Sequence, residues 1–163
     1  MTEPEPKKPE KPLRLSRDSV IMLTAAIFSL RSTCNKANGA VIAKDGRILS
    51  VGYNGAPPHH LHCLDEGCLL DDQGHCKRGI HAEVNAIAWA ARYGIPTEGS
   101  TLYCTTAPCP ECCKAIVNSG VIKVIYSKPY SDMTGIRELE ESGIKSEVLD
   151  KNWIENGIRL IGE

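Results

Sequence analysis

The sequence has few aromatic residues, no long apolar run and almost no net charge. Aromatic side chains make up 5% of the 163 residues, although 42% are hydrophobic, so the core must be largely aliphatic. No stretch approaches the roughly 20 apolar residues of a membrane span. With 19 basic and 20 acidic residues, the net charge of −1 gives no support to a basic nucleic-acid cleft. A small anionic substrate remains compatible, because one phosphate needs only one or two local cations.

The first residues, MTEPEPKKPEKP, also lack the apolar segment of a signal peptide, so we expect a cytoplasmic location. Residues 1–14 are rich in Pro, Glu and Lys and are predicted to form a disordered tail, with one domain over 15–163. The chain contains 8 cysteines. In a reducing compartment, cysteines in this number indicate metal binding rather than disulfides.

The apolar pattern predicts alternating helices and strands. A helix is expected over 16–32, then a β-hairpin over 39–55 that turns at Asp45-Gly46. Residues 55–79 have no clean period and are predicted to form a long, metal-stabilised loop. The remaining elements are helices over 81–93, 110–120 and 134–143 and strands over 100–106, 121–127 and 144–149. This order implies an α/β fold with a mixed sheet of about five strands and helices on both faces.

Two polar residues stand at the start of the alanine-rich helix RGIHAEVNAIAWAARYG. His81 and Glu83 have no structural need to be there, and their partners are found in TTAPCPECCKA. Cys109 and Cys112 begin the next helix at a spacing of i,i+3, so both sulfurs share one helical face. A helix N-terminus favours thiolates. We therefore expect His81, Cys109 and Cys112 to bind one zinc ion.

Three protein ligands leave the fourth position of a tetrahedral zinc open, as in catalytic zinc sites. Zinc lowers the pKa of bound water toward neutrality, and Glu83 is placed to take the water's proton and deliver it to a substrate. The pair H-x-E and P-C-x-x-C is the known signature of zinc nucleobase deaminases, here HAE at 81–83 and PCPEC at 108–112. Glu83 is thus the predicted catalytic residue.

Two structural alternatives stay open. Cys109 and Cys112 could join Cys63, Cys68 or Cys76 in a four-cysteine zinc knuckle, which leaves HAE unexplained. Alternatively, His81 and Glu83 could be a buried histidine and a carboxylate that interacts with the helix dipole.

Beyond this signature, the chain resembles the deoxycytidylate (dCMP) deaminases from residue 31 to residue 133. The resemblance rests on GAVIAKDGRILSVGYNG, HCKRGIHAEVNAI and TLYCTTAPCPECCKAIVNSGVIKVIY. It implies the three-layer α-β-α fold of cytidine deaminases and zinc-dependent hydrolysis of dCMP to dUMP and ammonia, which supplies thymidylate synthesis. It also implies a homohexamer that dCTP, with Mg, activates and dTTP inhibits.

The resemblance further implies substrate contacts. Asn54 of GYNG would bond the deoxyribose or base edge, the backbone of Ala82 and of Thr106–Ala107 would hold the pyrimidine, and Tyr130 would stack on the ring. The alternatives are a turn residue for Asn54 and a surface tyrosine for Tyr130. Lys36 and Arg78 lie beside the motifs and could bind a monophosphate, or could be solvated surface charges.

A second, structural zinc is also expected. Its five candidate ligands lie in segments that flank the active site: Cys34, Cys63, Cys68, His75 and Cys76. Family members use cysteines and a histidine from these regions, which favours Cys34, Cys63 and His75 with Cys68 or Cys76. The alternative is that these cysteines are free and pack as small hydrophobic residues.

The chain departs from the family at two positions. The usual GYNG-x-P-x-G is GYNGAPPHH here, with His59 or His60 in place of the flexible glycine, in a loop that belongs to the effector site of regulated members. Asn38 stands where the family has valine before Gly39, which admits a 5-substituted cytosine nucleotide as substrate. The other function classes are a polynucleotide or nucleoside deaminase and a non-catalytic zinc-stabilised binding module.

Overall fold

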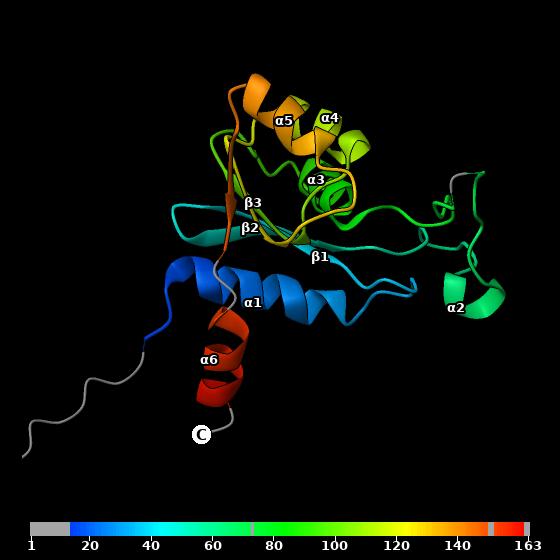
Figure 1. Cartoon of the computed structure of the whole chain (residues 1–163), viewed down its shortest axis with the longest axis horizontal. Helices are drawn as coiled ribbons and strands as arrows, with labels where there is room; N and C mark the ends of the chain where they lie inside the picture. Colours follow the sequence, from blue (N-terminus) through cyan, green and yellow to red (C-terminus); the bar gives the residue numbers. More distant parts are fainter. Residues whose placement is uncertain (1–13, 73, 150–151, 162–163) are drawn as a thin grey trace, which may run out of the picture.

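The computed structural model describes residues 14–72, 74–149 and 152–161 (Figure 1). Apart from residue 14, the predicted tail over 1–14 lies outside the described residues. The elements in chain order are α1 (Arg17–Ser29), β1 (Gly39–Lys44), β2 (Arg47–Tyr53), α2 (Cys63–Glu66), α3 (Ala82–Arg92), β3 (Thr101–Thr106), α4 (Pro110–Asn118), β4 (Lys123–Lys128), α5 (Thr134–Glu141), β5 (Lys145–Val148) and α6 (Asn152–Ile161). Over the described residues, no helix has the length and apolar character needed to cross a membrane.

The five strands form one mixed sheet in the order β2-β1-β3-β4-β5. Strand β1 runs antiparallel to both β2 and β3, whereas β3, β4 and β5 are parallel to one another. The predicted mixed five-stranded sheet is therefore confirmed. Its parallel half carries the helical crossovers that such pairs require.

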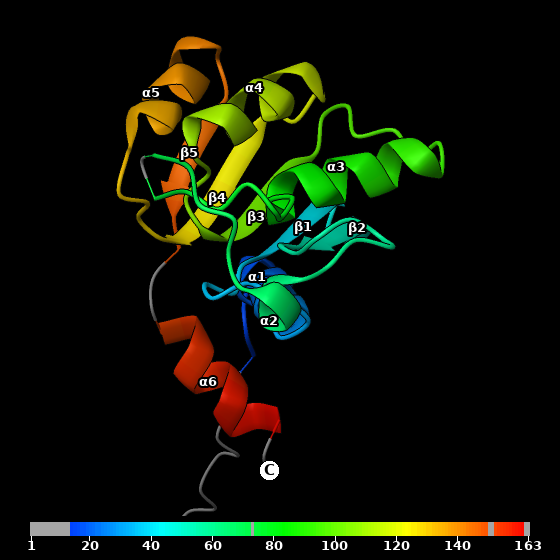
Figure 2. The same cartoon turned by 90° about the vertical axis from the view of Figure 1, so that its right-hand side faces the viewer.

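Helices cover both faces of the sheet (Figures 1 and 2). On one face, α1 and α6 pack over Val41, Tyr103 and Ile125. On the other, α3, α4 and α5 enclose a cluster that includes Ile42 and Leu102 together with Cys109 and Cys112. Helix α6 follows the last predicted strand and was not predicted, although Trp153 is buried in the first cluster.

The hairpin forms at the predicted turn. Asp45 and Gly46 have φ angles of 52° and 74°, and the flanking residues Lys44 and Arg47 are paired. Positive φ at both central residues is what a two-residue type I′ hairpin turn requires, and Asp-Gly adopts it readily. The sequence therefore determines this turn locally.

Helix α3 lies unusually close to β2. A Cβ atom on Gly52 would be 2.3 Å from the carbonyl oxygen of Ala82, so only glycine allows this approach. Two side chains complete the contact: Ser50 Oγ donates to the Ala86 carbonyl at 2.7 Å, and Asn85 Nδ2 donates to the Tyr53 carbonyl at 2.8 Å. These contacts fix the position of the helix start that carries His81 and Glu83.

The long loop between β2 and α3 lies beside the layered body in Figure 1. It holds the short helix α2 and is tied by two isolated bridges, Gly55 with Ile80 and Leu70 with Cys76. The first bridge returns the chain to β2 just before His81. The predicted loop thus contains one helical turn that the pattern did not show.

Candidate active site

The structure brings His81, Cys109 and Cys112 together, as the motif spacing predicts. Their ligand atoms all lie within 4.8 Å of one another, and His81 Nδ1 is 3.2 Å from Cys112 Sγ and 3.4 Å from Cys109 Sγ. Ordinary zinc bond lengths in a tetrahedron place a nitrogen and a sulfur ligand about 3.6 Å apart. The donor set and its spacing therefore fit one zinc ion.

Two helix N-termini build this cluster. His81 is the N-cap of α3 and Cys109 the N-cap of α4, both with extended backbone, and Pro110 occupies the first turn of α4. Proline suits this position because its missing N–H would be unpaired there in any case. Both helix dipoles point their positive ends at the cluster, which favours thiolates and a carboxylate.

The two cysteines differ in their ionisation. Hydrogen bonds with Cys112 and His81 lower the pKa of Cys109 to about 4, whereas the bond to Cys109 and burial raise the pKa of Cys112. The bond to Cys109 likewise raises the pKa of His81. Zinc, which needs deprotonated ligands, would displace the protons of this cluster when bound.

Glu83 lies directly behind the cluster. Its side chain is 7% exposed, and Oε2 accepts a hydrogen bond from Cys112 Sγ at 3.7 Å. Burial raises the pKa of this carboxyl, so it holds a proton more readily than an exposed glutamate. A carboxyl that can take up and return a proton beside a zinc site suits general acid–base catalysis.

The family model "cytidine and deoxycytidylate deaminase zinc-binding region" matches residues 16–128. The chain belongs to this deaminase family. Similar proteins include ComE operon protein 2 of Bacillus subtilis, 40% identical over 139 residues that span 84% of this chain and 73% of that protein. Deoxycytidylate deaminase of Enterobacteria phage T4 is 35% identical over 153 residues that span 71% of this chain and 79% of the phage protein.

Solved structures of this deaminase family confirm the fold. The dCMP deaminase of cyanophage S-TIM5, in complex with dCMP and dUMP, superposes with a TM-score of 0.74 at 35% identity. That match covers 84% of this chain and 99% of the cyanophage chain. The three-layer α-β-α prediction is therefore confirmed.

Asn54, the predicted substrate contact of GYNG, makes two bonds to the loop before β1. Its Nδ2 donates to the Lys36 carbonyl and its Oδ1 accepts from the Asn38 N–H, both at 2.7 Å. The amide thus fixes the backbone of this loop. Its contact with substrate stays a prediction.

The side chain of Asn38 links this loop to the end of β3. Its Oδ1 accepts hydrogen bonds from Thr106 Oγ1 at 2.7 Å and from Thr105 Oγ1 at 3.3 Å. The backbone N–H of Ala107 donates to the Lys128 carbonyl at 2.7 Å. Asn38, which departs from the family pattern, thus accepts a hydrogen bond from the side chain of Thr106. The resemblance places the backbone of Thr106 at the substrate.

Other predicted contacts lie around the metal cluster. Ala82 and Ala107 are buried beside Cys109 and Cys112, and Tyr130 packs against the same core group. Burial raises the pKa of the Tyr130 phenol. These positions agree with a ring-binding wall, although their contacts with substrate stay predictions.

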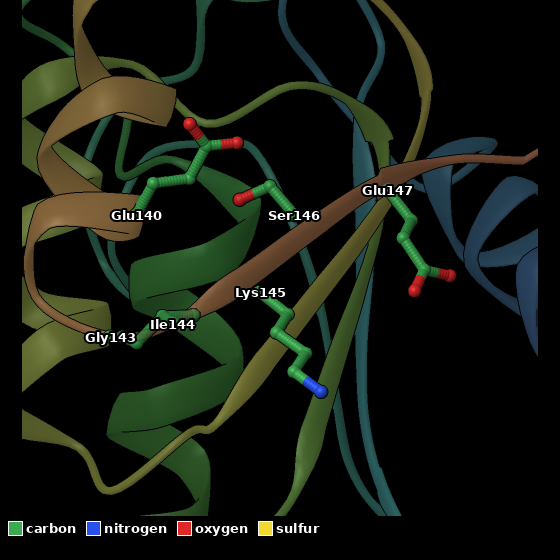
Figure 3. Close-up of a pocket in the computed structure, with 6 residues that line it drawn as sticks. All are labelled: Glu140, Gly143, Ile144, Lys145, Ser146 and Glu147. Atoms are coloured by element: carbon green, nitrogen blue, oxygen red, sulfur yellow. The ribbon is translucent and has the colours of Figure 1, made fainter.

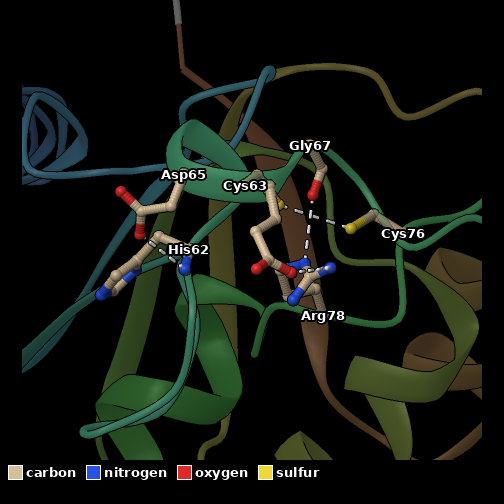
Figure 4. Close-up of polar contacts among 7 residues, drawn as sticks. His62, Cys63, Asp65, Gly67, Cys76 and Arg78 are labelled. Carbon is tan, nitrogen blue, oxygen red and sulfur yellow. Dashed lines mark hydrogen bonds and ion pairs between the residues drawn. The ribbon is translucent and has the colours of Figure 1, made fainter.

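Arg78 points toward the loop that contains α2 (Figure 4). Its Nε donates to the Gly67 carbonyl at 3.1 Å, and Nη2 lies 4.0 Å from Glu66 Oε2. The guanidinium therefore braces the loop, and its contact with a phosphate stays a prediction. Lys36 is exposed, and its carbonyl binds Asn54.

A second cysteine cluster lies in the same loop. The sulfurs of Cys63, Cys68 and Cys76 lie within 4.8 Å of one another, and those of Cys63 and Cys76 are 3.6 Å apart (Figure 4). Cys34 is not part of this mutually close group, and burial raises the pKa of its thiol. Among the described residues, His75 is outside this group, and its Nδ1 lies 3.9 Å from Asp71 Oδ2.

Two hollows lie away from the candidate metal ligands. One of about 390 Å³ runs along α5 and β5, lined by Glu140 and residues 143–147 (Figure 3). Another of about 350 Å³ lies between β2 and α3 and includes Trp89 and Tyr93. Neither contains a residue of the metal clusters, so the chemistry of the ligands, rather than the size of a hollow, locates the active site.

Proposed function

We propose that this chain is a zinc-dependent enzyme that hydrolyses dCMP to dUMP and ammonia. The observation that carries the proposal is the His81, Cys109 and Cys112 cluster with Glu83 bonded to it. It is supported by 35% identity to a cyanophage enzyme solved with dCMP and dUMP. The product would supply dTMP synthesis.

Each part of the site has a chemical role in this proposal. Zinc, when bound, supplies Lewis-acid activation of water near neutral pH. Glu83 holds and moves the proton at Oε2, and its buried position excludes bulk water from that transfer. Tyr130 and the backbone around Ala82 and Ala107 would hold the pyrimidine beside Glu83.

Replacing Glu83 by glutamine tests the mechanism. Glutamine keeps the shape of the side chain but cannot carry the proton, so we expect kcat to fall at least about 10²-fold. Zinc content and circular dichroism should not change. The matched control is Glu111→Gln, which alters an exposed carboxylate in the first turn of α4 and should keep full activity. Normal turnover by E83Q would overturn the mechanism.

A side-by-side assay of cytidine, deoxycytidine, dCMP and dCTP tests the substrate. We expect the largest kcat/KM for dCMP. A 5-substituted cytosine nucleotide belongs in the same panel, because Asn38 departs from the family pattern and its side chain binds the hydroxyls of Thr105 and Thr106. A preference for the unphosphorylated nucleoside would overturn the dCMP proposal.

We also infer a second, structural zinc bound by four cysteines: Cys34, Cys63, Cys68 and Cys76. The sulfurs of Cys63, Cys68 and Cys76 are clustered, and two sulfur ligands of one tetrahedral zinc lie about 3.8 Å apart, close to the 3.6 Å between Cys63 and Cys76. Cys34 would complete the set, as the resemblance to the family suggests. This ligand set replaces the expected His75 by a cysteine. It would hold the loop between β2 and α3 in place.

The remaining parts of the proposal concern assembly and regulation. A homohexamer, activation by dCTP with Mg and inhibition by dTTP are proposed by resemblance to the family, and a cytoplasmic location from the sequence alone. Light scattering with and without dCTP tests assembly and effector binding together. A monomer under both conditions would contradict the hexamer.

A further inference from the structure

Asn38 extends the pairing of β1 with β2 by one residue beyond the strand. The register of the two strands pairs Gly39 with Tyr53, and backbone bonds then join Asn38 to Asn54. The Asn54 N–H donates to the Asn38 carbonyl at 3.2 Å, and the Asn38 N–H donates to Asn54 Oδ1 at 2.7 Å. Because these bonds fix the backbone of Asn38, its side chain leaves the chain in a defined direction.

This direction is toward the face of the sheet that carries the candidate zinc ligands. Successive side chains of a strand point to opposite faces, so Asn38 shares a face with Ala40 and Ile42. Both of these residues are buried in the cluster that also contains Cys109 and Cys112. The Asn38 side chain is therefore on the catalytic side of the sheet.

The same side chain is bonded to the end of β3. The antiparallel register pairs Ala40 with Cys104, which places Asn38 opposite Thr106 two residues further along. Thr106 Oγ1 donates to Asn38 Oδ1 at 2.7 Å. Thr106 is the last residue of β3 and precedes Cys109 by three residues. Asn38 thus contacts the segment that leads into the first cysteine ligand.

Asn38 is also joined to the segment of the histidine ligand. Its partner Asn54 precedes Gly55, which exchanges two backbone hydrogen bonds with Ile80, of 2.8 Å and 3.2 Å. Ile80 directly precedes His81, the N-cap of α3. Asn38 therefore connects the two segments that bring the candidate zinc ligands together.

The Nδ2 group of Asn38 is available as a hydrogen-bond donor. Oδ1 accepts from Thr106 Oγ1 and, at 3.3 Å, from Thr105 Oγ1, which itself accepts the Gly39 N–H at 3.1 Å. This arrangement directs the Thr105 proton to the Asn38 oxygen and so orients the amide. Over the described residues, Nδ2 makes no hydrogen bond to the protein, and it is not sealed from solvent. Its two N–H bonds can therefore serve a bound molecule.

We propose that Asn38 is a specificity-determining residue that donates from Nδ2 to a substrate hydroxyl which dCMP lacks. The proposal rests on the proposed deaminase function. Valine, which the family pattern has at this position, offers no donor, so binding of dCMP does not require one. The added donor fits a hydroxyl where dCMP has only C–H bonds, either on C2′ of the sugar or on a 5-substituent of cytosine.

The test compares the zinc-loaded wild type with Asn38→Val on dCMP, CMP, 5-methyl-dCMP and 5-hydroxymethyl-dCMP. Valine is close to asparagine in size but donates no hydrogen bond. In N38V, one ratio of kcat/KM values should fall about threefold to tenfold, the scale of one net hydrogen bond. A fall in the ratio of CMP to dCMP places the hydroxyl on C2′. A fall in the ratio of 5-hydroxymethyl-dCMP to 5-methyl-dCMP places it on the 5-substituent, because the methyl group needs the same room without the bond.

Asn118→Val is the matched control. Asn118 ends α4, and its exposed Nδ2 donates to the Lys114 carbonyl at 2.8 Å, so this variant should leave both ratios unchanged. Thr106→Val is a second test variant, which keeps Asn38 but removes the shorter of the two bonds that orient its amide. The affected ratio should fall partway toward that of N38V, and circular dichroism shows whether each variant is folded.

Two results would overturn the role of Asn38. Unchanged kcat/KM values for all four nucleotides in N38V would exclude the hydrogen bond. An equal loss on all four would show that Asn38 only supports the loop before β1. If N38V did not fold, T106V would decide between these results. Failure of the proposed function is distinguishable, because the wild-type protein would then show no turnover of dCMP.

Discussion

His59 occupies a backbone conformation that glycine adopts more readily. Its φ is 67°, in a turn closed by a hydrogen bond from the His60 N–H to the Pro57 carbonyl at 3.1 Å. A turn with proline in the second place and positive φ in the third usually has glycine there. The dCMP deaminase pattern places glycine at this same position. Between the two histidines named from the sequence, the structure thus assigns the glycine position to His59.

His59→Gly should therefore stabilise the protein. Removing the Cβ relieves the left-handed strain, although glycine costs more entropy on folding, so we expect a net gain of about 0.5–1 kcal/mol. The midpoint of urea unfolding measures this gain. His60→Gly is the matched control, because the His60 side chain is also exposed and its φ is not positive. This substitution should destabilise the protein slightly. Equal effects of the two substitutions would refute the strain argument.

At the scale of elements, the contact of α3 with β2 sets the catalytic geometry. His81 and Glu83 stand at the first turn of α3, and Gly52 lies against the backbone of this turn. A new Cβ there would meet backbone atoms, which cannot move aside as a flexible side chain can. The whole helix start must shift to admit a methyl group.

Gly52→Ala should thus reduce both stability and activity. Overpacking of this kind costs about 1–3 kcal/mol. Displacement of the catalytic groups should lower kcat about 10-fold to 100-fold. Gly55→Ala is the control in the same motif, because its nearest contact is the Thr33 side chain at 3.3 Å. If both variants lost kcat and stability equally, close packing at Gly52 would not be the cause.

At the scale of the whole molecule, one loop connects the cluster of Cys63, Cys68 and Cys76 with the cluster of His81, Cys109 and Cys112. Cys76 belongs to the loop cluster and precedes His81 of the catalytic cluster by five residues. Arg78, bonded to Gly67 between them, ties α2 to the approach of α3. A metal in the loop cluster would thus stabilise the segment that leads to the active site.

Metal analysis tests this arrangement. We expect about two zinc ions per wild-type chain and about one in the double variant Cys63→Ser with Cys76→Ser, measured by mass spectrometry. The variant should also melt at a lower temperature, because the loop loses its cross-link. Cys113→Ala, which changes a buried packing cysteine outside both clusters, should retain two zinc ions. A wild-type content of one zinc would contradict the second site.

Features carried by short sequence segments were predictable. The Asp45-Gly46 turn depends on two residues, the spacing of Cys109 and Cys112 on one helical turn, and the succession of strands along the chain on apolar runs between turn residues. Helix α6 escaped prediction although its sequence is strongly amphipathic, and its Trp153 is buried in the cluster that α1 also lines. Helix α2 also escaped prediction, because it is only four residues long.

The sequence by itself determined the sheet, the starts of α3 and α4 and the candidate zinc ligands, because these follow from periodicity and from spacing within one turn. Only the tertiary structure decided the directions of side chains in the segments without a period. It turned Arg78 to Gly67, engaged Asn54 with Lys36 and Asn38, and left His75 outside the cysteine cluster. Such directions depend on contacts between residues distant in the chain, which no local pattern specifies.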